Sequence, residues 1–262
     1  LVEQVKREEF RQAPPFPFDL GSLQSEAYRI FGYTPMRTSQ VAQRLYLDAL
    51  ISYPRTSSQK LPPTIGYQTI LRGLSRNSAY TKLTSALLAK QLLKPVEGKK
   101  VDPAHPAIYP TGNMPERTLS SAEKNIWDLV VRRFMAAFGD YAVWQTATVI
   151  LNINGNLFEL RGKKVLAEGW LRFYEPYAPL EDKPMPNVTE GQEISVKKVV
   201  LEDKFTSPPP RYNPSSLLKK MEKENIGTKA TRAGIIQTLY ERKYIRGDRI
   251  AVTELGFEVV DA

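Results

Sequence analysis

Residues 213–252 read NPSSLLKKMEKENIGTKATRAGIIQTLYERKYIRGDRIAV, and their pattern is the clearest fold signal in the chain. Asn213 is a preferred N-cap and Pro214 suits the first helical position, which predicts a helix starting there. Thr228 can cap a second helix over 229–242. Two short apolar runs separated by Arg-Gly-Asp-Arg follow, which favours a two-stranded wing. Helix, turn, helix and wing is the pattern of a winged-helix domain.

Earlier parts of the chain show two other periodicities. Before residue 140, apolar side chains at helical spacing predict helices over 22–31, from a cap at Thr38 or Ser39, on either side of 73–78, and from a cap at Ser120 or Ser121. From Tyr141 the period changes to two, which predicts a hairpin around Asn154-Gly155 and strands around Val165 and over 170–174 and 193–201. Residues 1–11 fit a strand or a helix end, and residues 50–56 fit a strand broken by Pro54.

The charge of the chain is concentrated in two places. Its 262 residues include 37 Lys and Arg against 28 Asp and Glu, a formal net charge of +9. Residues 61–100 hold 7 basic and 1 acidic residue, and residues 211–249 hold 10 and 4. Such clusters fit either solvated helix faces or a surface that binds nucleic-acid phosphates. Charge alone leaves both interpretations open.

Several classes of site are excluded by residues that the sequence lacks. With no Cys and one His, it has no disulfide, iron–sulfur cluster, thiolate zinc site, cysteine nucleophile or multi-histidine metal site. It contains neither a P-loop nor an Asp-x-Asp pair, so we expect no Mg²⁺ site within these residues. No apolar run approaches the roughly 20 residues that span a bilayer. The start at Leu1 is typical of neither a signal peptide nor an initiator, and we expect a longer parent chain.

Residues 52–58, Ser-Tyr-Pro-Arg-Thr-Ser-Ser, hold the most suggestive reactive side chains. A phenol has a pKa of about 10 and attacks a phosphate only if the developing charge is stabilised. Arg55 follows Tyr53 by two residues on a strand-like segment, so both side chains would point to one face. The hydroxyl of Thr56 and those of its neighbours add phosphate-binding donors. The pattern also fits an amphipathic tyrosine beside a salt-bridging arginine near a turn.

His105 is the only histidine of the sequence, and histidine is the residue type most often used to transfer protons in catalysis. It stands in a loop over 95–118 that contains several Pro and Gly residues. A lone histidine in such a loop is more often a surface or capping residue than a functional one. Its local sequence alone therefore does not favour a role in catalysis.

Three segments, in this order, resemble the type IA DNA topoisomerases. Ala42-Gln43-Arg44-Leu45-Tyr46 and then residues 50–57 are similar to the active-site tyrosine region of that family. Residues 105–111 are similar to its His-x-Ala-Ile-x-Pro motif. Residues 205–212, with 217–219 and 226–232, are similar to the stretch around the start of its second winged helix. The spacing also fits, so the resemblance covers nearly the whole chain.

The resemblance implies a reaction and roles for individual residues. Tyr53 would attack a phosphodiester of single-stranded DNA, leaving a 5′-phosphotyrosyl bond and a free 3′-hydroxyl. Another strand would pass through the gap, and religation would reverse the attack without a nucleotide. By the same match, Arg55 would hold the scissile phosphate and His105 would assist. The implied or expected DNA contacts are Arg44, Thr56, Thr206, Arg211, Lys229 and Arg232.

The resemblance also implies an α+β architecture in three parts, which together form the arch of a toroid. Residues 13–140 would be a helical, winged-helix-like gate domain that carries the tyrosine. Residues 1–12 and 141–205 would form a discontinuous β-rich hinge domain, and 206–262 a partial base domain with the second winged helix. The Mg²⁺-binding Toprim domain of the family would precede these residues. We therefore expect this chain to hold no metal and to bind DNA without relaxing it.

Two positions depart from the bacterial members of the family. Pro54 stands where Met is usual, and Ser57-Ser58 stands where Asp-Ser is usual. These residues are similar to those of the archaeal enzymes and of the topoisomerase half of reverse gyrases. They leave the role of Ser57 open.

The alternative function is a non-enzymatic winged-helix regulator that binds duplex DNA through residues 229–242. The start of that segment is poor in Asn and Gln, which read base edges, and the β-rich insertion would have no role. A tyrosine recombinase is disfavoured because it needs several arginines around a tyrosine near the C-terminus. We expect DNA as the partner, preferably single-stranded, a monomer, a cytoplasmic location at the nucleoid, and no membrane association.

Overall fold

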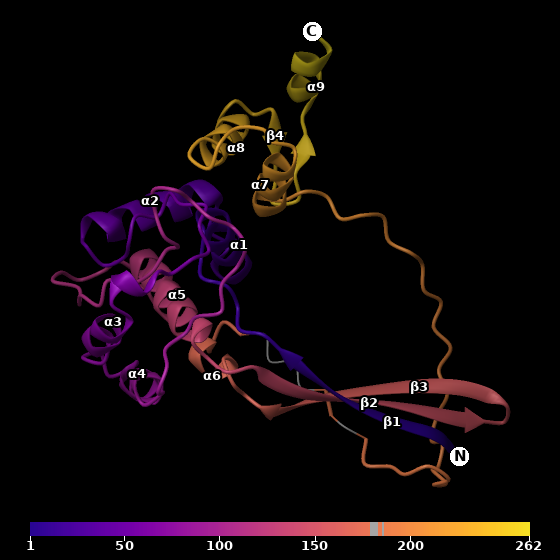
Figure 1. Cartoon of the computed structure of the whole chain (residues 1–262). Helices are drawn as coiled ribbons and strands as arrows, with labels where there is room; N and C mark the ends of the chain where they lie inside the picture. The colour runs from indigo at the N-terminus through magenta and orange to yellow at the C-terminus, as the bar shows by residue number, and fades with distance from the viewer. Residues whose placement is uncertain (179–182, 185) are drawn as a thin grey trace. The chain divides into compact units, whose positions relative to one another are not determined.

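A three-stranded antiparallel sheet brings the N-terminal residues together with the middle of the chain. Strand β1 (Val2–Gln12) pairs with β2 (Ala142–Ile153), and β2 pairs with β3 (Asn156–Ala167), so β2 is central (Figure 1). Asn154 and Gly155 form the β2–β3 turn, both at positive φ. A tight hairpin needs residues that tolerate this backbone, which is why the Asn-Gly pair predicted the turn correctly.

The structure, a computed structural model, describes residues 1–178, 183–184 and 186–262. Contacts divide the chain into two units. Leu1–Pro14 and Gly139–Pro209 form one, here called the strand unit, and Pro15–Phe138 and Pro210–Ala262 form the other, the helical unit. The division into gate, hinge and base domains stays a prediction.

Trp144 lies at the centre of the contacts across the sheet. Its buried ring stacks on Phe10 of β1 with the centroids 6.4 Å apart, and Nζ of Lys163 on β3 lies 3.9 Å from its centroid. Its Nε1 donates a hydrogen bond of 2.8 Å to Oε1 of Gln12. Since a slip of one residue would turn each side chain to the other face, these contacts stabilise the observed register.

Two strands expected from the sequence are not found in the described residues. Residues 170–174 contain instead the short helix α6 (Leu171–Tyr174), in which Leu171, Phe173 and Tyr174 are all buried. Adjacent buried residues, as at 173 and 174, do not fit the alternation of a half-exposed strand. Residues 193–201 are almost entirely exposed and pair with no strand of the sheet, so nothing stabilises an extended ladder there.

The helical unit is built around one long helix. α5 (Ser121–Ala137) buries ten of its side chains and contacts α1 (Leu20–Phe31), α2 (Pro35–Leu47) and α4 (Thr81–Leu88) (Figure 1). The remaining elements of this unit are the 3₁₀ turn η1 (Pro63–Ile65), α3 (Tyr67–Leu74), α7 (Pro214–Lys223), α8 (Arg232–Glu241), β4 (Ile245–Arg246), β5 (Ala251–Val252) and α9 (Glu254–Asp261).

The C-terminal helices have a small core of their own and also pack on the N-terminal helices. Leu218, Met221 and Ile236 form that core between α7 and α8. Within the helical unit, α7 contacts α1 and α8 contacts α2. The order of two helices and a two-stranded ribbon is the one predicted from residues 213–252. Its assignment as a winged helix stays a prediction.

Helix caps show where local sequence signals were sufficient. Ser120 and Asn213 cap α5 and α7 as predicted, each in a reciprocal capping box. The predicted cap of α2 was wrong: Thr34 caps that helix, and Thr38 is buried inside it. Pro35 at the first helical position was the missed signal. The predicted cap of α8 at Thr228 was also wrong, because α8 begins at Arg232 and Thr231 stands at its N-cap position.

Two other expectations for the helical unit need correction. Residues 50–56 are not a strand, because their only sheet pairing is an isolated bridge from Ile51 to Pro110. Helix α9 was not predicted at all. Within the described part of the chain, no helix is long and apolar enough to cross a membrane.

Replacing Glu123 by Gln should remove an acid-sensitive part of the stability. Glu123 is 4% exposed, and Arg117 binds both of its carboxylate oxygens at 2.8 and 3.1 Å. These bonds and one from the Ser120 N–H lower the pKa of Glu123 to about 2. Because the folded pKa is depressed, the stabilisation is complete above the usual pKa of 4.5 and is lost as pH falls toward 2.

We expect Glu123→Gln to lower the free energy of unfolding by about 2 kcal/mol at pH 7, with the difference closing by about pH 2. Urea unfolding at several pH values measures both. The exposed Glu116→Gln is the matched control and should stay within about 0.5 kcal/mol of wild type. An equal loss for Glu123→Gln at both ends of the pH range would contradict the ion pair as its cause.

Candidate active site

The segment that carries Tyr53 is fixed to the loop that carries His105. Ile51 forms an isolated β-bridge with Pro110. The N–H of Ser52 donates to the carbonyl of Tyr109 at 2.8 Å, and the N–H of Tyr109 donates to Oγ of Ser52 at 3.0 Å. Two stretches more than fifty residues apart in sequence are thereby held side by side within the helical unit.

Tyr53 and His105 are in direct contact. Their ring centroids lie 4.6 Å apart at an interplanar angle of 47°. The half-buried Tyr53 ring also makes an edge-type contact with Tyr46, with centroids 5.3 Å apart. The structure therefore brings together the two residues that the resemblance placed in the reaction, although their roles stay proposals.

Arg55 and Arg44 line one groove with Lys229. Its volume is about 420 Å³, and it lies between α2, through side chains such as Gln43, and the residues at the start of α8. Arg55 and Arg44 are exposed. Two exposed arginines on a concave surface suit an anionic ligand such as a phosphate.

Thr56, a predicted DNA contact, is buried in the helical unit. It is 1% exposed, and its Oγ1 donates to the carbonyl of His105 at 3.2 Å while accepting from the N–H of Ser58 at 3.0 Å. Ser58 is equally buried, and its Oγ accepts from the N–H of Lys60. These hydroxyls satisfy backbone groups of a tight turn, as Ser and Thr often do. Thr56 therefore fixes the tyrosine segment against the histidine loop, and its contact with DNA stays a prediction.

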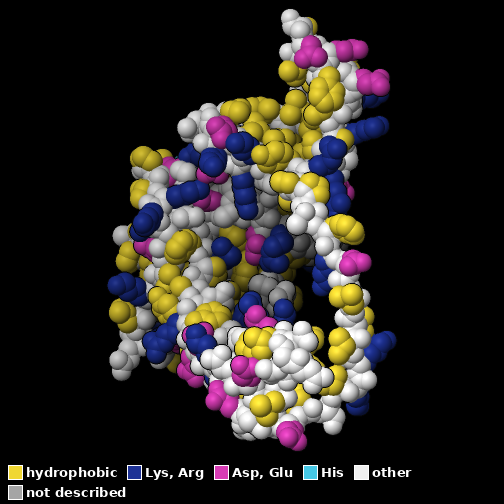
Figure 2. All heavy atoms as spheres, turned by 90° about the vertical axis from the view of Figure 1, so that its right-hand side faces the viewer, with side chains coloured by type: hydrophobic (Ala, Val, Ile, Leu, Met, Phe, Trp, Pro, Cys, Tyr) yellow, Lys and Arg dark blue, Asp and Glu magenta, His cyan; other side chains and the backbone are white. Residues whose placement is uncertain are grey.

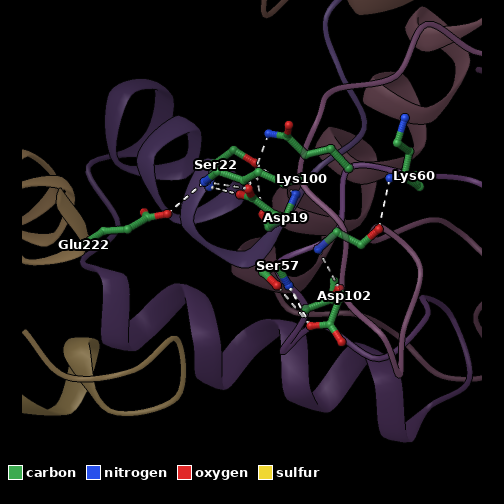
Figure 3. A network of polar contacts seen from close by, with 10 residues as sticks. Asp19, Ser22, Ser57, Lys60, Lys100, Asp102 and Glu222 are labelled. Carbon is green, nitrogen blue, oxygen red and sulfur yellow. Dashed lines mark hydrogen bonds and ion pairs between the residues drawn. The ribbon is translucent and has the colours of Figure 1, made fainter. Parts of the chain in front are cut away.

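Sequence reasoning missed Asp102, the most buried charge near the tyrosine. Its side chain is 3% exposed. Oδ2 accepts from both the N–H and Oγ of Ser57 at 3.1 Å (Figure 3). Oδ1 accepts from the N–H of Ala104 at 3.1 Å. It also forms an ion pair with Lys229. That pair first, and then the bonds from the backbone, hold the pKa of Asp102 well below its usual range.

Lys229 and Arg232, both predicted DNA contacts, have protein partners. Lys229 pairs with Asp102. Arg232 donates from Nε to the carbonyl of Ile226 at 2.9 Å and from Nη2 to that of Gly227 at 3.1 Å. Arg232 therefore stabilises the turn that precedes α8. A contact of either residue with DNA stays a prediction.

Thr206 and Arg211 are exposed on either side of the boundary between the two units. Thr206 belongs to the strand unit and Arg211 to the helical unit. Their side chains are open to solvent, and their contacts with DNA stay predictions.

Several cations of the two basic segments are neutralised locally. Nζ of Lys100 lies 2.8 Å from Glu222 on α7 and 3.2 Å from Asp19, the N-cap of α1 (Figure 3). Burial alone would lower the pKa of Lys100, but its bonds with Glu222 and Asp19 outweigh burial and raise the pKa. Figure 2 shows Asp and Glu interspersed among the Lys and Arg side chains of the visible face. Some of the lysines in these basic segments are thus held in ion pairs within the fold.

The described residues contain no group of three or more His, Asp or Glu side chains that could hold a metal ion. Asp102 does not fit as a ligand, because Lys229, Ser57 and Ala104 already occupy both of its oxygens. The expectation that Mg²⁺ is held by another domain stays a prediction.

Comparisons with known proteins agree with one another. The family model described as DNA topoisomerase matches residues 1–262. The chain is 46% identical to DNA topoisomerase 1 of Methanothermobacter thermautotrophicus and 45% identical to that of Pyrococcus horikoshii, each over 260 residues. Those matches cover 99% and 98% of the chain, but only 36% and 38% of the relatives.

A solved structure of full-length topoisomerase I from Thermotoga maritima has the same fold. It superimposes with a TM-score of 0.78 at 28% identity and covers 100% of this chain and 44% of the solved one. The chain thus spans about two fifths of the length of its relatives. The motifs around Tyr53 and His105, the fold and these matches all show that the chain belongs to the type IA DNA topoisomerase family.

Proposed function

We propose that Tyr53 is the nucleophile that cleaves single-stranded DNA. Its phenolic oxygen attacks a backbone phosphorus, a 5′-phosphotyrosyl bond forms, and the 3′ oxygen leaves and takes a proton to become a hydroxyl. Religation is the same exchange in reverse. One phosphoester replaces another, so the step needs no nucleotide. The observation that carries the proposal is the packing against His105 of Tyr53, which stands two residues before Arg55, a residue that lines a groove with Arg44.

The two neighbours of Tyr53 would stabilise the charge that develops during the attack. Arg55 presents a planar guanidinium, which can bind two phosphate oxygens at once. The imidazole of His105 can donate a hydrogen bond to an oxygen of the phosphate. Since Thr56 holds the carbonyl of His105, the imidazole has a fixed anchor beside the phenol.

The groove between α2 and the start of α8 is the proposed path of the single strand. Arg44 and Arg55 contribute exposed positive charge to it, and a flexible single strand can follow a charged groove without base-specific contacts. Thr206, Arg211 and the second winged helix, with Lys229 and Arg232, would extend this surface.

The complete enzyme would add what these residues do not supply. We propose that a Toprim domain elsewhere in the protein holds Mg²⁺, that a second strand passes through the cleaved one, and that the enzyme acts as a monomer in the cytoplasm at the nucleoid. This chain alone would bind DNA without relaxing it. The support is the resemblance together with the limited share of the relatives that the chain covers.

Removing the phenolic oxygen should separate cleavage from binding. In the complete enzyme, Tyr53→Phe should reduce cleavage of a labelled single-stranded oligonucleotide by roughly 10⁴-fold or more, because no nucleophile remains. Its affinity for the same oligonucleotide should stay within about twofold, since the ring remains. Tyr46→Phe is the matched control and should retain cleavage. Comparable cleavage by wild type and Tyr53→Phe would rule out the proposed nucleophile.

If the single strand lies in the groove, the salt dependence of its binding should change when a groove arginine is removed. We expect Arg44→Ala to weaken binding of a single strand by about fivefold and to reduce the slope of log affinity against log salt by about 0.7, as for one lost phosphate contact. Arg72→Ala, an exposed arginine on α3, should change neither quantity.

The same titration with a duplex of matching sequence tests the alternative function. Fluorescence anisotropy at several salt concentrations gives all of the affinities needed. Tighter binding of the duplex than of the single strand, with the same loss of affinity in Arg44→Ala and Arg72→Ala, would favour the regulator over the enzyme.

A further inference from the structure

Asp102 connects three separate segments of the helical unit. Its oxygens accept from the N–H and Oγ of Ser57 and from the N–H of Ala104, and its charge pairs with Lys229. Ser57 is four residues beyond Tyr53, and Ala104 directly precedes His105. One buried carboxylate therefore holds both segments that meet in the Tyr53–His105 contact.

Lys229 belongs to a turn whose conformation is fixed independently of Asp102. The N–H of Thr228 donates to Oγ1 of Thr231 at 2.9 Å, and Arg232 binds the carbonyls of Ile226 and Gly227. The helix that follows, α8, packs against α2. The position of the Lys229 ammonium is thus set by how the C-terminal helices lie on α2.

We propose that Asp102 is a positioning residue, and that its ion pair with Lys229 couples the seating of the turn before α8 to the geometry of Tyr53 and His105. This inference rests on the function proposed above. When the turn is seated, Lys229 neutralises the buried carboxylate. When the turn moves away, the carboxylate keeps its three donors but loses its counter-charge in a buried place. The two loops that it holds must then shift or admit water.

Lys100 provides a matched control for Lys229, because it also joins the C-terminal helices to the rest of the unit through ion pairs. Its partners are Glu222 on α7 and Asp19 at the start of α1. Neither of these carboxylates bonds to the segment 53–58 or to the loop at 104–105. Loss of the Lys100 bridges therefore weakens the packing of the C-terminal helices without removing a partner of Asp102.

The sequence makes a direct readout possible, because His105 is the only histidine. With ¹³C-labelled histidine, the imidazole gives a single set of NMR signals from the 262-residue chain. A Tyr53 ring 4.6 Å away shifts these signals through its ring current. Tyr53→Leu gives the reference position without that ring. The readout requires neither metal nor DNA cleavage.

We expect Lys229→Gln and Asp102→Asn to move the His105 signals most of the way toward the Tyr53→Leu reference. Lys229→Arg should restore the wild-type position, because it keeps the charge. Lys100→Gln should leave the signals near wild type. Unmoved signals in both Lys229→Gln and Asp102→Asn would overturn the proposal, as would an equal movement in Lys100→Gln, since the effect would then be general loosening.

Kinetics of the complete enzyme test the same coupling. Lys229→Gln should lower kcat for cleavage, measured at saturating single strand, by about 10- to 100-fold. A loss of affinity with kcat unchanged would assign Lys229 to DNA binding instead and overturn the positioning role. If Tyr53 proved not to be the nucleophile, the NMR result would still stand, so the two proposals fail separately.

Discussion

Burying the Asp102 carboxylate costs free energy because its charge loses hydration, and three hydrogen-bond donors and one ammonium group offset that cost. Those donors come from the segment after Tyr53 and from the residue before His105. The ammonium comes from Lys229, more than a hundred residues later in the chain. The Tyr53–His105 contact therefore depends on a charge that can be buried only when all of these partners are in place.

Other polar side chains around Tyr53 also hold loops in position. Ser52 and Thr56 form bonds to backbone groups of the histidine loop, so nearly every small hydroxyl near the tyrosine has a structural partner. Lys100 similarly joins Asp19, the N-cap of α1, to Glu222 near the end of α7. Polar side chains here position loops that lack regular secondary structure, which leaves the exposed Arg44 and Arg55 as the groups best placed to meet an anionic ligand.

Much of the local structure could be predicted from short sequence signals. The Asn154-Gly155 hairpin and the caps at Ser120 and Asn213 follow from turn and capping chemistry, which acts over a few residues. The helices on either side of 73–78 follow from apolar side chains at helical spacing. The predictions of strands over 170–174 and 193–201 were wrong. Burial and pairing with another strand, and not local alternation, decide whether a strand forms. Residues 50–56 look like a strand for the same local reason, but find only one bridging partner at Pro110.

The candidate site was predictable in part. The motif around Tyr53 and the motif around His105 indicated two residues that the structure does bring into contact. Neither the burial of Thr56 nor the Asp102–Lys229 pair could be predicted, because both depend on segments far apart in sequence. The open question of Ser57 now has a structural answer: its N–H and hydroxyl both bind the Asp102 carboxylate.

The most direct test of the central claim is to locate the covalent bond to DNA. The complete enzyme would be incubated with a labelled single-stranded oligonucleotide, denatured during cleavage, digested with protease, and the DNA-linked peptide fragmented by mass spectrometry. We expect the 5′-phosphate of the DNA to be bonded to Tyr53, in the peptide that ends at Arg55. A phosphate on Tyr46 or on any other residue would contradict it.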